Sequence, residues 1–241
     1  MTALLRLDNV SKFYGALKAV DDVSVAVESG EALAVIGPNG AGKTTLFNLI
    51  AGNAAPSRGR IEFEGADMTF MAPHARSRLG IGRSYQIPHP FANMSVFENL
   101  LVGAIHGGGA AERESYRHCA AVLKITGLYD KANMPARTLT LLQRKRLELA
   151  RALAMQPKLL LLDEIAGGLT EYECGELVKT IKAIHARGTT IVWIEHIVHA
   201  LLSVASRLIV MNFGQILAHG EPHKVMADAR VREVYMGMPV S

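Results

Sequence analysis

The stretch that decides the fold is GPNGAGKT at residues 37–44, which fits the pattern G-x-x-x-x-G-K-[ST]. Glycines allow the backbone to bend so that successive N–H groups point at phosphate oxygens. The apolar run ALAVIG at 32–37 precedes the motif and is typical of a buried strand, and the helical stretch TTLFNLIAG follows it. A helix that begins at such a loop adds its positive N-terminal end. This context predicts a binding site for the phosphates of a nucleotide rather than a plain glycine-rich turn.

The side chains of this loop are expected to have separate roles. Lys43 is expected to reach the outer phosphates, the Thr44 hydroxyl to ligate Mg²⁺, and Thr45 to touch an inner phosphate. The predicted nucleotide-binding residues of the loop are Gly37, Pro38, Asn39, Gly40, Ala41, Gly42, Lys43, Thr44 and Thr45.

Two further apolar runs end in polar residues. The run LLLLDE at 159–164 reads as a strand that ends in carboxylates. We expect Asp163 to lie beside the phosphate loop and hold the Mg²⁺ shell, and Glu164 to orient or deprotonate the attacking water. His196 ends the run TTIVWIEH, where a lone histidine is usually a structural residue. Because this strand belongs to the same expected sheet, we interpret His196 as a contact to the γ-phosphate at the edge that carries Glu164.

Composition limits the class of protein. The chain has 241 residues, of which 49% are hydrophobic and 20% charged, enough to bury a sizeable core. The net charge of +4 is not gathered in a basic block interleaved with aromatics, so nucleic acid is not an expected partner. The two cysteines, Cys119 and Cys174, form neither a metal-spaced pair nor a disulfide framework, which indicates a reducing compartment. With no signal peptide and only short apolar runs, we expect a soluble chain whose membrane segments, if it uses any, lie on another chain.

Strands and helices alternate along much of the chain, which predicts an α/β fold with a mostly parallel sheet. The expected strands are 23–27, 32–37, 159–162, 189–196 and 207–212, and the expected helices around them include 172–187 and 196–206.

The middle of the chain differs, because residues 87 to 156 show helical patterns and no convincing strand. A helix begins at Ser95, where Ser95-x-x-Glu98 forms a capping box. The further expected elements are a loop at 107–115 and helices at 115–126 and 141–156. We therefore predict one domain over 1–241, with an α/β core at 1–86 and 157–241 and a helical subdomain at 87–156.

Taken together, these residues resemble the ATP-binding cassette of ABC transporters over nearly the whole chain. GPNGAGKTT, LLLLDE and His196 match the family's phosphate loop, second nucleotide motif and switch histidine. Tyr14 in SKFYG is similar to the aromatic that stacks on adenine, and Gln86 in GRSYQ to the glutamine that joins the Mg²⁺ site and senses the membrane partner. The resemblance implies a P-loop NTPase core, an antiparallel β subdomain and an inserted all-helical subdomain.

The resemblance also implies a function. The chain would be the ATP-binding, ATP-hydrolysing subunit of a transporter, with Glu164, His196 and Lys43 as catalytic residues. Its cofactors would be ATP and Mg²⁺, the metal being held by Thr44, Gln86 and Asp163. Its partners would be a second cassette, transmembrane permease subunits and, indirectly, a solute-binding protein, at the cytoplasmic face of the inner membrane. The stretch GRSYQIPHPFANMSVFENLLVG and the short tail ending in VREVYMG look most like the branched-chain amino-acid uptake group.

The stretch TLTLLQ at 138–143 departs from the family. The family's signature L-S-G-G-Q falls on residues 139–143, so Thr140 and Gln143 keep a hydroxyl and an amide for nucleotide, but leucines replace both glycines. Thr140-x-x-Gln143 is also a capping box, and both interpretations can hold. The following RKR at 144–146 is interpreted as a solvated helix face, at least for Lys145 and Arg146. Thr170 stands where the family usually places Asp or Asn to couple the two sites of a dimer.

Three functions remain open from the sequence. The first is a transport motor that closes on ATP with a second cassette, a heterodimer being favoured over a homodimer because the signature is altered. The second is a soluble ABC-type ATPase acting on nucleic acid or ribosomes, which would usually carry two cassettes or a coiled-coil arm. The third is a non-hydrolysing regulatory cassette, against which the presence of Lys43, Gln86, Asp163, Glu164 and His196 argues.

Overall fold

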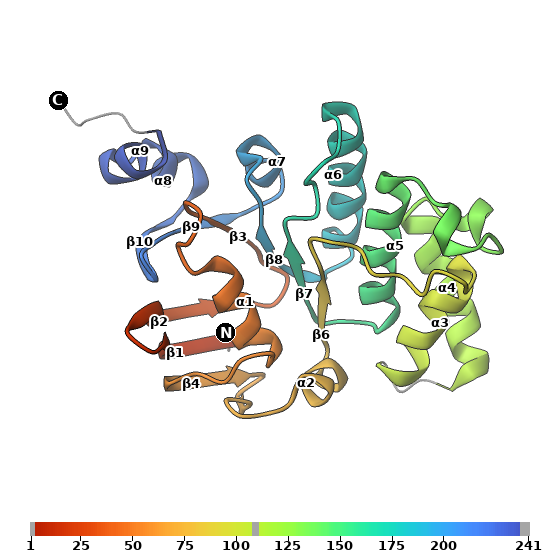
Figure 1. Cartoon of the computed structure of the whole chain (residues 1–241), viewed down its shortest axis with the longest axis horizontal. Helices are drawn as coiled ribbons and strands as arrows, with labels where there is room; N and C mark the ends of the chain where they lie inside the picture. Colours follow the sequence, from red (N-terminus) through yellow and green to blue (C-terminus); the bar gives the residue numbers. More distant parts are fainter. Residues whose placement is uncertain (1–2, 108–110, 237–241) are drawn as a thin grey trace. The chain divides into compact units, whose positions relative to one another are not determined.

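The structure is a computed structural model that describes residues 3–107 and 111–236 (Figure 1). It forms two compact units, Met1–Arg76 with Thr190–Ser241, and Ser77–Thr189. The predicted boundaries of the α/β core and the helical subdomain rest on other criteria and stay a prediction. Residues 108–110 of the predicted loop and Gly237 of the tail lie outside the described residues.

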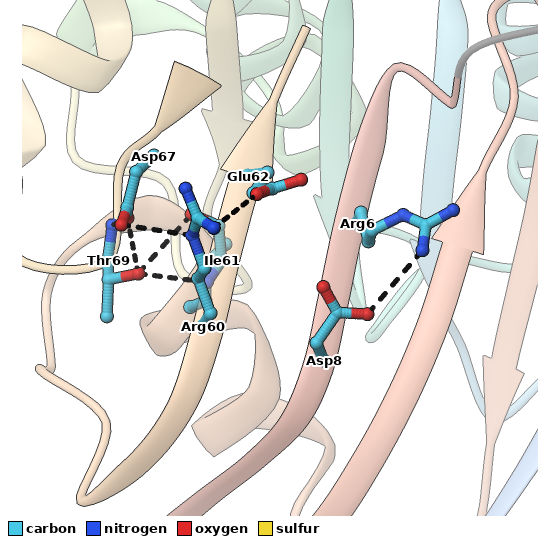
Figure 2. A network of polar contacts seen from close by, with 7 residues as sticks. All are labelled: Arg6, Asp8, Arg60, Ile61, Glu62, Asp67 and Thr69. Carbon is cyan, nitrogen blue, oxygen red and sulfur yellow. Dashed lines mark hydrogen bonds and ion pairs between the residues drawn. The ribbon is translucent and has the colours of Figure 1, made fainter. Parts of the chain in front are cut away.

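The first unit holds an antiparallel sheet in the order β2-β1-β4-β5. Its strands are β1 (Leu5–Tyr14), β2 (Leu17–Val27), β4 (Arg58–Phe63) and β5 (Ala66–Asp67), and the predicted strand at 23–27 is the end of β2. Figure 2 shows the polar side chains on this sheet, where Arg60 pairs with Glu62 and Asp67 at 3.1 Å each. Hydrogen bonds from Thr69 lower the pKa of the Asp67 carboxyl. Such solvent-exposed pairs fix local geometry more than they stabilise the fold.

The same unit contains parallel strands in the order β10-β9-β3-β8. They are β3 (Ala32–Ile36), β8 (Thr190–Ile194) and β9 (Arg207–Asn212), with β10 (Gln215–Gly220) antiparallel to β9. Every residue of β3 and β8 is buried, as expected for parallel strands. The helices are α1 (Lys43–Ala51), α2 (Pro73–Leu79, which continues into the second unit), α7 (Val198–Leu202), α8 (Pro222–Ala227) and α9 (Ala229–Met236).

A buried arginine anchors the end of α1. Arg76 is 1% exposed, and its guanidinium donates to the carbonyls of Leu49 at 2.6 Å and Ile50 at 2.9 Å. It also donates to the carbonyls of Met71 and Thr69, each at 2.9 Å. Burial lowers its pKa to about 10. The last carbonyls of a helix have no partner within it and carry partial negative charge, so this cation fixes the helix that begins in the phosphate loop.

The second unit pairs β6 (Ile81–Ser84) with β7 (Leu159–Asp163) in parallel and carries the helical part of the chain. Its helices are α3 (Val96–His106), α4 (Glu112–Ile125), α5 (Leu141–Ala154) and α6 (Glu171–His185), with single 3₁₀ turns at Tyr129–Lys131 and Ala136–Thr138. The described residues between 87 and 156 contain no strand, only an isolated bridge between Ser95 and Pro135. This region is therefore helical, as the sequence predicts.

Several element boundaries differ from the prediction. The loop expected up to residue 115 ends earlier, because α4 begins at Glu112. Acidic side chains at Glu112 and Glu114 favour a helix N-terminus there. The expected strand 189–196 is shorter, and β6 was not predicted at all. Among the described helices, none combines the length and apolarity needed to cross a bilayer.

Candidate nucleotide site

The phosphate loop of the first unit is shaped by its glycines. β3 ends at Ile36, and a Cβ added at Gly37 would lie 2.3 Å from the carbonyl oxygen of Met211. A Cβ at Gly42 would lie 2.2 Å from the carbonyl oxygen of Ala19. Real side chains never approach backbone oxygens this closely, so only glycine fits at either position. The close packing fixes where the loop's N–H groups lie.

Lys43 folds back over the loop to which it belongs. Its side chain is buried, and Nζ donates to the carbonyl oxygens of Gly37 at 2.8 Å and Pro38 at 3.0 Å. The ammonium group is therefore held at the loop's centre, where phosphate oxygens would compete with these carbonyls. Thr44 is exposed and Thr45 half-buried in the first turn of α1, which contains no acidic residue. This turn has the features of an anion-binding helix N-terminus.

The strand register brings His196 to the loop's edge of the sheet. β3 and β8 are parallel, with Val35 opposite Ile194. Gly37 and His196 each follow two residues later, so both leave the sheet at the same edge. His196 is exposed there.

Tyr14, the predicted adenine-stacking residue, is the last residue of β1. It is 51% exposed, and the Lys12 ammonium lies 5.1 Å from its ring centroid. A half-exposed ring at the end of a strand can present a face to a planar base.

In the second unit, a parallel pair of strands brings Gln86 and Glu164 together. Ser84 of β6 lies opposite Leu162 of β7, and Gln86 and Glu164 each come two positions after these paired residues. Gln86 Nε2 donates to Glu164 Oε2 at 2.8 Å. Glu164 has a φ of 46°, in the left-handed region that non-glycine residues rarely adopt. Strained backbone of this kind clusters at functional sites, where the surroundings hold a side chain in a required direction.

Asp163 has a partner that the sequence analysis missed. Arg83 Nη2 lies 2.7 Å from Asp163 Oδ2, and both side chains are 7% exposed. Taking two charges out of water is costly, so a buried pair of this kind needs good geometry, which this contact has. Arg83 lies in the stretch IGRS, which forms β6 and gave no signal of its own in the sequence. Magnesium ligation through Asp163 would have to coexist with this ion pair.

The altered signature begins α5. Thr140 is its N-cap, and the predicted capping box is present, since the Thr140 hydroxyl accepts from Gln143 N–H and the Gln143 side chain accepts from Thr140 N–H. Leu141 is 45% exposed and Leu142 half-buried, so neither belongs to the fully buried core. Thr170 plays the same part in α6, where it forms a capping box with Glu173.

The interpretation of Lys145 and Arg146 as a solvated face is wrong. Lys145 is 4% exposed and its Nζ donates to the main-chain oxygen of Gln86. The Arg146 side chain is 17% exposed and pairs with Glu176 at 3.7 Å. Tertiary contacts with residues far along the chain cover both side chains, and the run RKR itself gives no local sign of them.

The predicted residues thus fall into two sets. Tyr14, the phosphate loop and His196 lie in the first unit, and Gln86, Thr140, Gln143, Asp163 and Glu164 lie in the second. Each set fits its expected chemistry: backbone N–H groups, an ammonium and a hydroxyl for phosphates, and oxygen donors for a hard cation. Their assembly into one site stays a prediction.

The comparison with known protein families identifies the family of the chain. The sequence model of the ABC transporter family matches residues 20–167, more than half of the chain. The chain belongs to the ABC transporter family. It is the ATP-binding, ATP-hydrolysing cassette of that family, as the sequence predicted.

Relatives of the cassette match it over nearly their full length. A probable branched-chain amino acid transport ATP-binding protein LivG from Methanocaldococcus jannaschii is 35% identical, with 97% of each chain covered. The lipopolysaccharide export system ATP-binding protein LptB from Escherichia coli (strain K12) is 33% identical, with 98% of each chain covered. A crystal structure of the ADP conformation of an ATP-binding cassette of an ABC transporter is 33% identical, with a TM-score of 0.89, and covers 99% of this chain and 100% of that one. The predicted P-loop NTPase fold is therefore confirmed.

Proposed function

We propose that the cassette powers the uptake of small solutes, branched-chain amino acids or related compounds, through separate transmembrane permease subunits. The hydrogen bond between Gln86 and Glu164 carries the motor assignment, because it joins the residue expected to sense the membrane partner to the residue expected to activate water. The similarity to LivG supports the solute class. The site of action would be the cytoplasmic face of the inner membrane.

Each residue has a defined part in the proposed hydrolysis. The loop N–H groups, Lys43 and Thr45 bind the phosphates, and Lys43 and His196 stabilise the charge that develops on the γ-phosphate. Glu164 accepts a proton from the attacking water or orients it, while the Gln86 amide holds one of its oxygens. Magnesium, when bound by Thr44, Gln86 and Asp163, would neutralise phosphate charge.

The similarity to LptB makes the transported solute the part of this proposal that needs a direct test. The cassette should be produced together with its transmembrane permease subunits, in vesicles loaded with ATP. Labelled leucine, isoleucine or valine should accumulate with ATP, and the Lys43→Ala variant should abolish this accumulation. ATP-dependent movement of a lipid-linked saccharide, with no amino-acid uptake, would overturn the solute assignment.

A soluble ABC-type ATPase acting on nucleic acid or ribosomes is the competing class. The two classes differ in what the chain should accompany through fractionation. A motor should sediment with membranes and be released with its permease by detergent. Co-purification with nucleic acid at low salt, lost as salt rises, would favour the alternative.

Replacing Tyr14 tests the proposed adenine stack. Tyr14→Ala should weaken nucleotide binding by about 1–3 kcal/mol, the scale of base–aromatic stacking. Tyr14→Phe and Tyr14→Trp should bind nearly as well as the native chain, because the stack uses the ring face and no hydrogen bond. Titration with a fluorescent ATP analogue measures all three, and equal affinity of the Ala variant and the native chain would refute the stack.

The segment 87–100 is the proposed docking site for a cytoplasmic loop of the permease. This segment begins directly after Gln86, and within it Phe91 is 45% exposed and Met94 half-buried. Replacing both with Glu should uncouple hydrolysis from transport and leave nucleotide affinity nearly intact. Solute uptake per ATP hydrolysed in vesicles is the measurement, with Phe70→Glu, the same change at an exposed aromatic outside the segment, as control. Normal uptake by the Phe91/Met94 variant would place the contact elsewhere.

A second cassette completes the proposed complex, and a heterodimer fits this chain better than a homodimer. The phosphate-binding residues are all present, whereas the signature has lost both glycines. A partner with an intact signature would supply what this chain lacks.

A further inference from the structure

One side of α5 carries three charged residues that contact the main chain of Gln86 and His89. Lys145, Glu148 and Arg151 follow one another at intervals of three, which places them on neighbouring turns. Lys145 Nζ donates to the main-chain oxygen of Gln86. The Glu148 carboxylate accepts from the backbone N–H of His89, and Arg151 Nη1 donates to the backbone oxygen of His89 at 2.9 Å.

Two of these three side chains are buried. Lys145 is 4% exposed and Glu148 is 6% exposed. Arg151 Nη1 lies 3.0 Å from Glu148 Oε2, and the Arg151 guanidinium lies 5.0 Å from the ring centroid of Phe91. Burial raises the pKa of the Glu148 carboxyl, and Arg151 opposes that rise. Burying a charged group is unfavourable unless it is paired or hydrogen-bonded. Here all three charged side chains form hydrogen bonds with main-chain atoms of a segment outside the helix.

The segment that they hold is itself stiff. It reads QIPHPF over residues 86–91, so two of its six residues are prolines with fixed φ, and each proline also restricts the residue before it. Contacts at Gln86, His89 and Phe91 therefore fix the whole segment to α5. A hollow of about 320 Å³ opens beside it, lined by Gln86, Ile87, Pro88, Leu141, Lys145 and Gly167.

Residues 86–91 lead to Glu164 through the Gln86 side chain, and α5 leads to the altered signature at its N-terminus. Gln86 donates its side-chain amide to Glu164 at 2.8 Å. α5 begins at Leu141, next to Thr140 of the altered signature. A single rigid connection thus joins the signature to the carboxylate that is proposed to activate water.

We propose that Lys145 is a positioning residue for hydrolysis: by holding the Gln86 main chain on α5, it sets the Gln86 amide against Glu164. With Glu148 and Arg151 it makes α5 and residues 86–91 move as one body. A shift of the signature end, when a second cassette closes on it, is thereby transmitted to Glu164 of the same chain. This inference rests on the proposed role of Glu164.

The test uses ATP hydrolysis by the assembled transporter, with nucleotide affinity and thermal unfolding measured on the same variants. Lys145→Met removes the donor and should lower kcat by about tenfold or more, since small misplacements of catalytic groups have large effects. KM should change by less than about twofold, since the phosphate-binding residues are untouched. Lys145→Arg keeps a donor and should restore most of kcat. Arg146→Met, which removes a partly buried cation from the same helix, should lower stability without this loss of kcat.

A double-mutant cycle with Gln86→Ala separates positioning from a general structural effect. The Gln86→Ala chain has no amide to place, so adding Lys145→Met should lower kcat little further. A full additional loss in that background would show that Lys145 acts by another route and overturn the proposal. So would an unchanged kcat with a lowered unfolding temperature. Where Lys145→Met does not fold, Lys145→Leu, which also lacks a donor, takes its place with the same expectations.

Glu164→Gln, measured alongside, keeps this proposal distinct from the function on which it rests. If Glu164→Gln leaves hydrolysis unchanged, the proposed role of Glu164 fails whatever Lys145 does. If it removes hydrolysis while Lys145→Met is silent, only the positioning role fails.

Discussion

Glu164→Gln is expected to preserve ATP binding and to reduce turnover by about 10²-fold or more, the contribution of a positioned general base. The amide has the shape of the carboxylate but cannot take a proton from water. Its oxygen can still accept the hydrogen bond that Gln86 now donates to Glu164. Glu164 is not part of the phosphate loop, so the affinity for nucleotide should not fall.

The measurement is steady-state ATP hydrolysis by the assembled transporter, with nucleotide affinity determined separately. Glu114→Gln is a matched control, because it makes the same change at an exposed carboxylate in the first turn of α4. Unchanged hydrolysis in the Glu164→Gln transporter would sink the assignment. A loss of affinity as large as the loss of turnover would instead indicate that Glu164 serves in binding.

The backbone conformation of Glu164 also supports a catalytic role for this residue. Its φ of 46° is unfavourable for a residue with a Cβ, by an amount on the order of 1–3 kcal/mol. A chain selected only for stability would place glycine there, as at Gly168, where φ is 79°. The carboxylate is therefore retained at a cost to the backbone, which is what a catalytic group at a strand end would require.

The sequence predicted well where the signal is local. β3, β7 and β9 are short apolar runs between turn residues, and the phosphate loop has a fixed spacing because each glycine meets a steric demand, as at Gly37 and Gly42. Capping boxes at Ser95 and Thr140 were equally readable, since the two partners stand three residues apart.

What the sequence could not show depends on contacts between distant residues. Arg83 and Asp163 are 80 positions apart, and Lys145 and Gln86 are 59 apart. No local sequence pattern predicts contacts between residues so far apart, and a basic residue on a helix is more often solvated than buried. β6 was missed for a related reason: four residues that include a glycine and an arginine have too little β character until β7 pairs with them.

The altered signature leads to the second large expected effect. In the proposed heterodimer, one site joins this chain's Lys43 and Glu164 to the partner's intact signature. The other joins the partner's phosphate loop to Thr140 and Gln143 of this chain. Glu164→Gln here should therefore remove most of the transporter's hydrolysis, and the matching change in the partner should remove much less. Equal losses from the two changes would mean that the sites are equivalent.

The two leucines of the altered signature lie at the surface. Leu141 is 45% exposed and Leu142 half-buried at the start of α5, so their side chains occupy surface where the family has only backbone. Glycine allows a ligand to approach a helix N-terminus closely, and leucine side chains restrict that approach. If they crowd the weaker site, Leu141→Gly/Leu142→Gly should raise its hydrolysis, measured with the stronger site silenced by Glu164→Gln.

Glycine in the first turn of α5 also weakens the helix, by about 1 kcal/mol at each position. Leu141→Ala/Leu142→Ala separates the two effects, because alanine removes the bulk of the side chains and keeps the helix propensity. Crowding predicts a gain from both double variants, whereas a need for backbone freedom predicts a gain from glycine alone. The Thr140 capping box remains in each, since it joins residues on either side of the leucines. No gain from either variant, together with equal losses from the two glutamate changes, would mean that the two sites are equivalent and that the leucines do not limit hydrolysis.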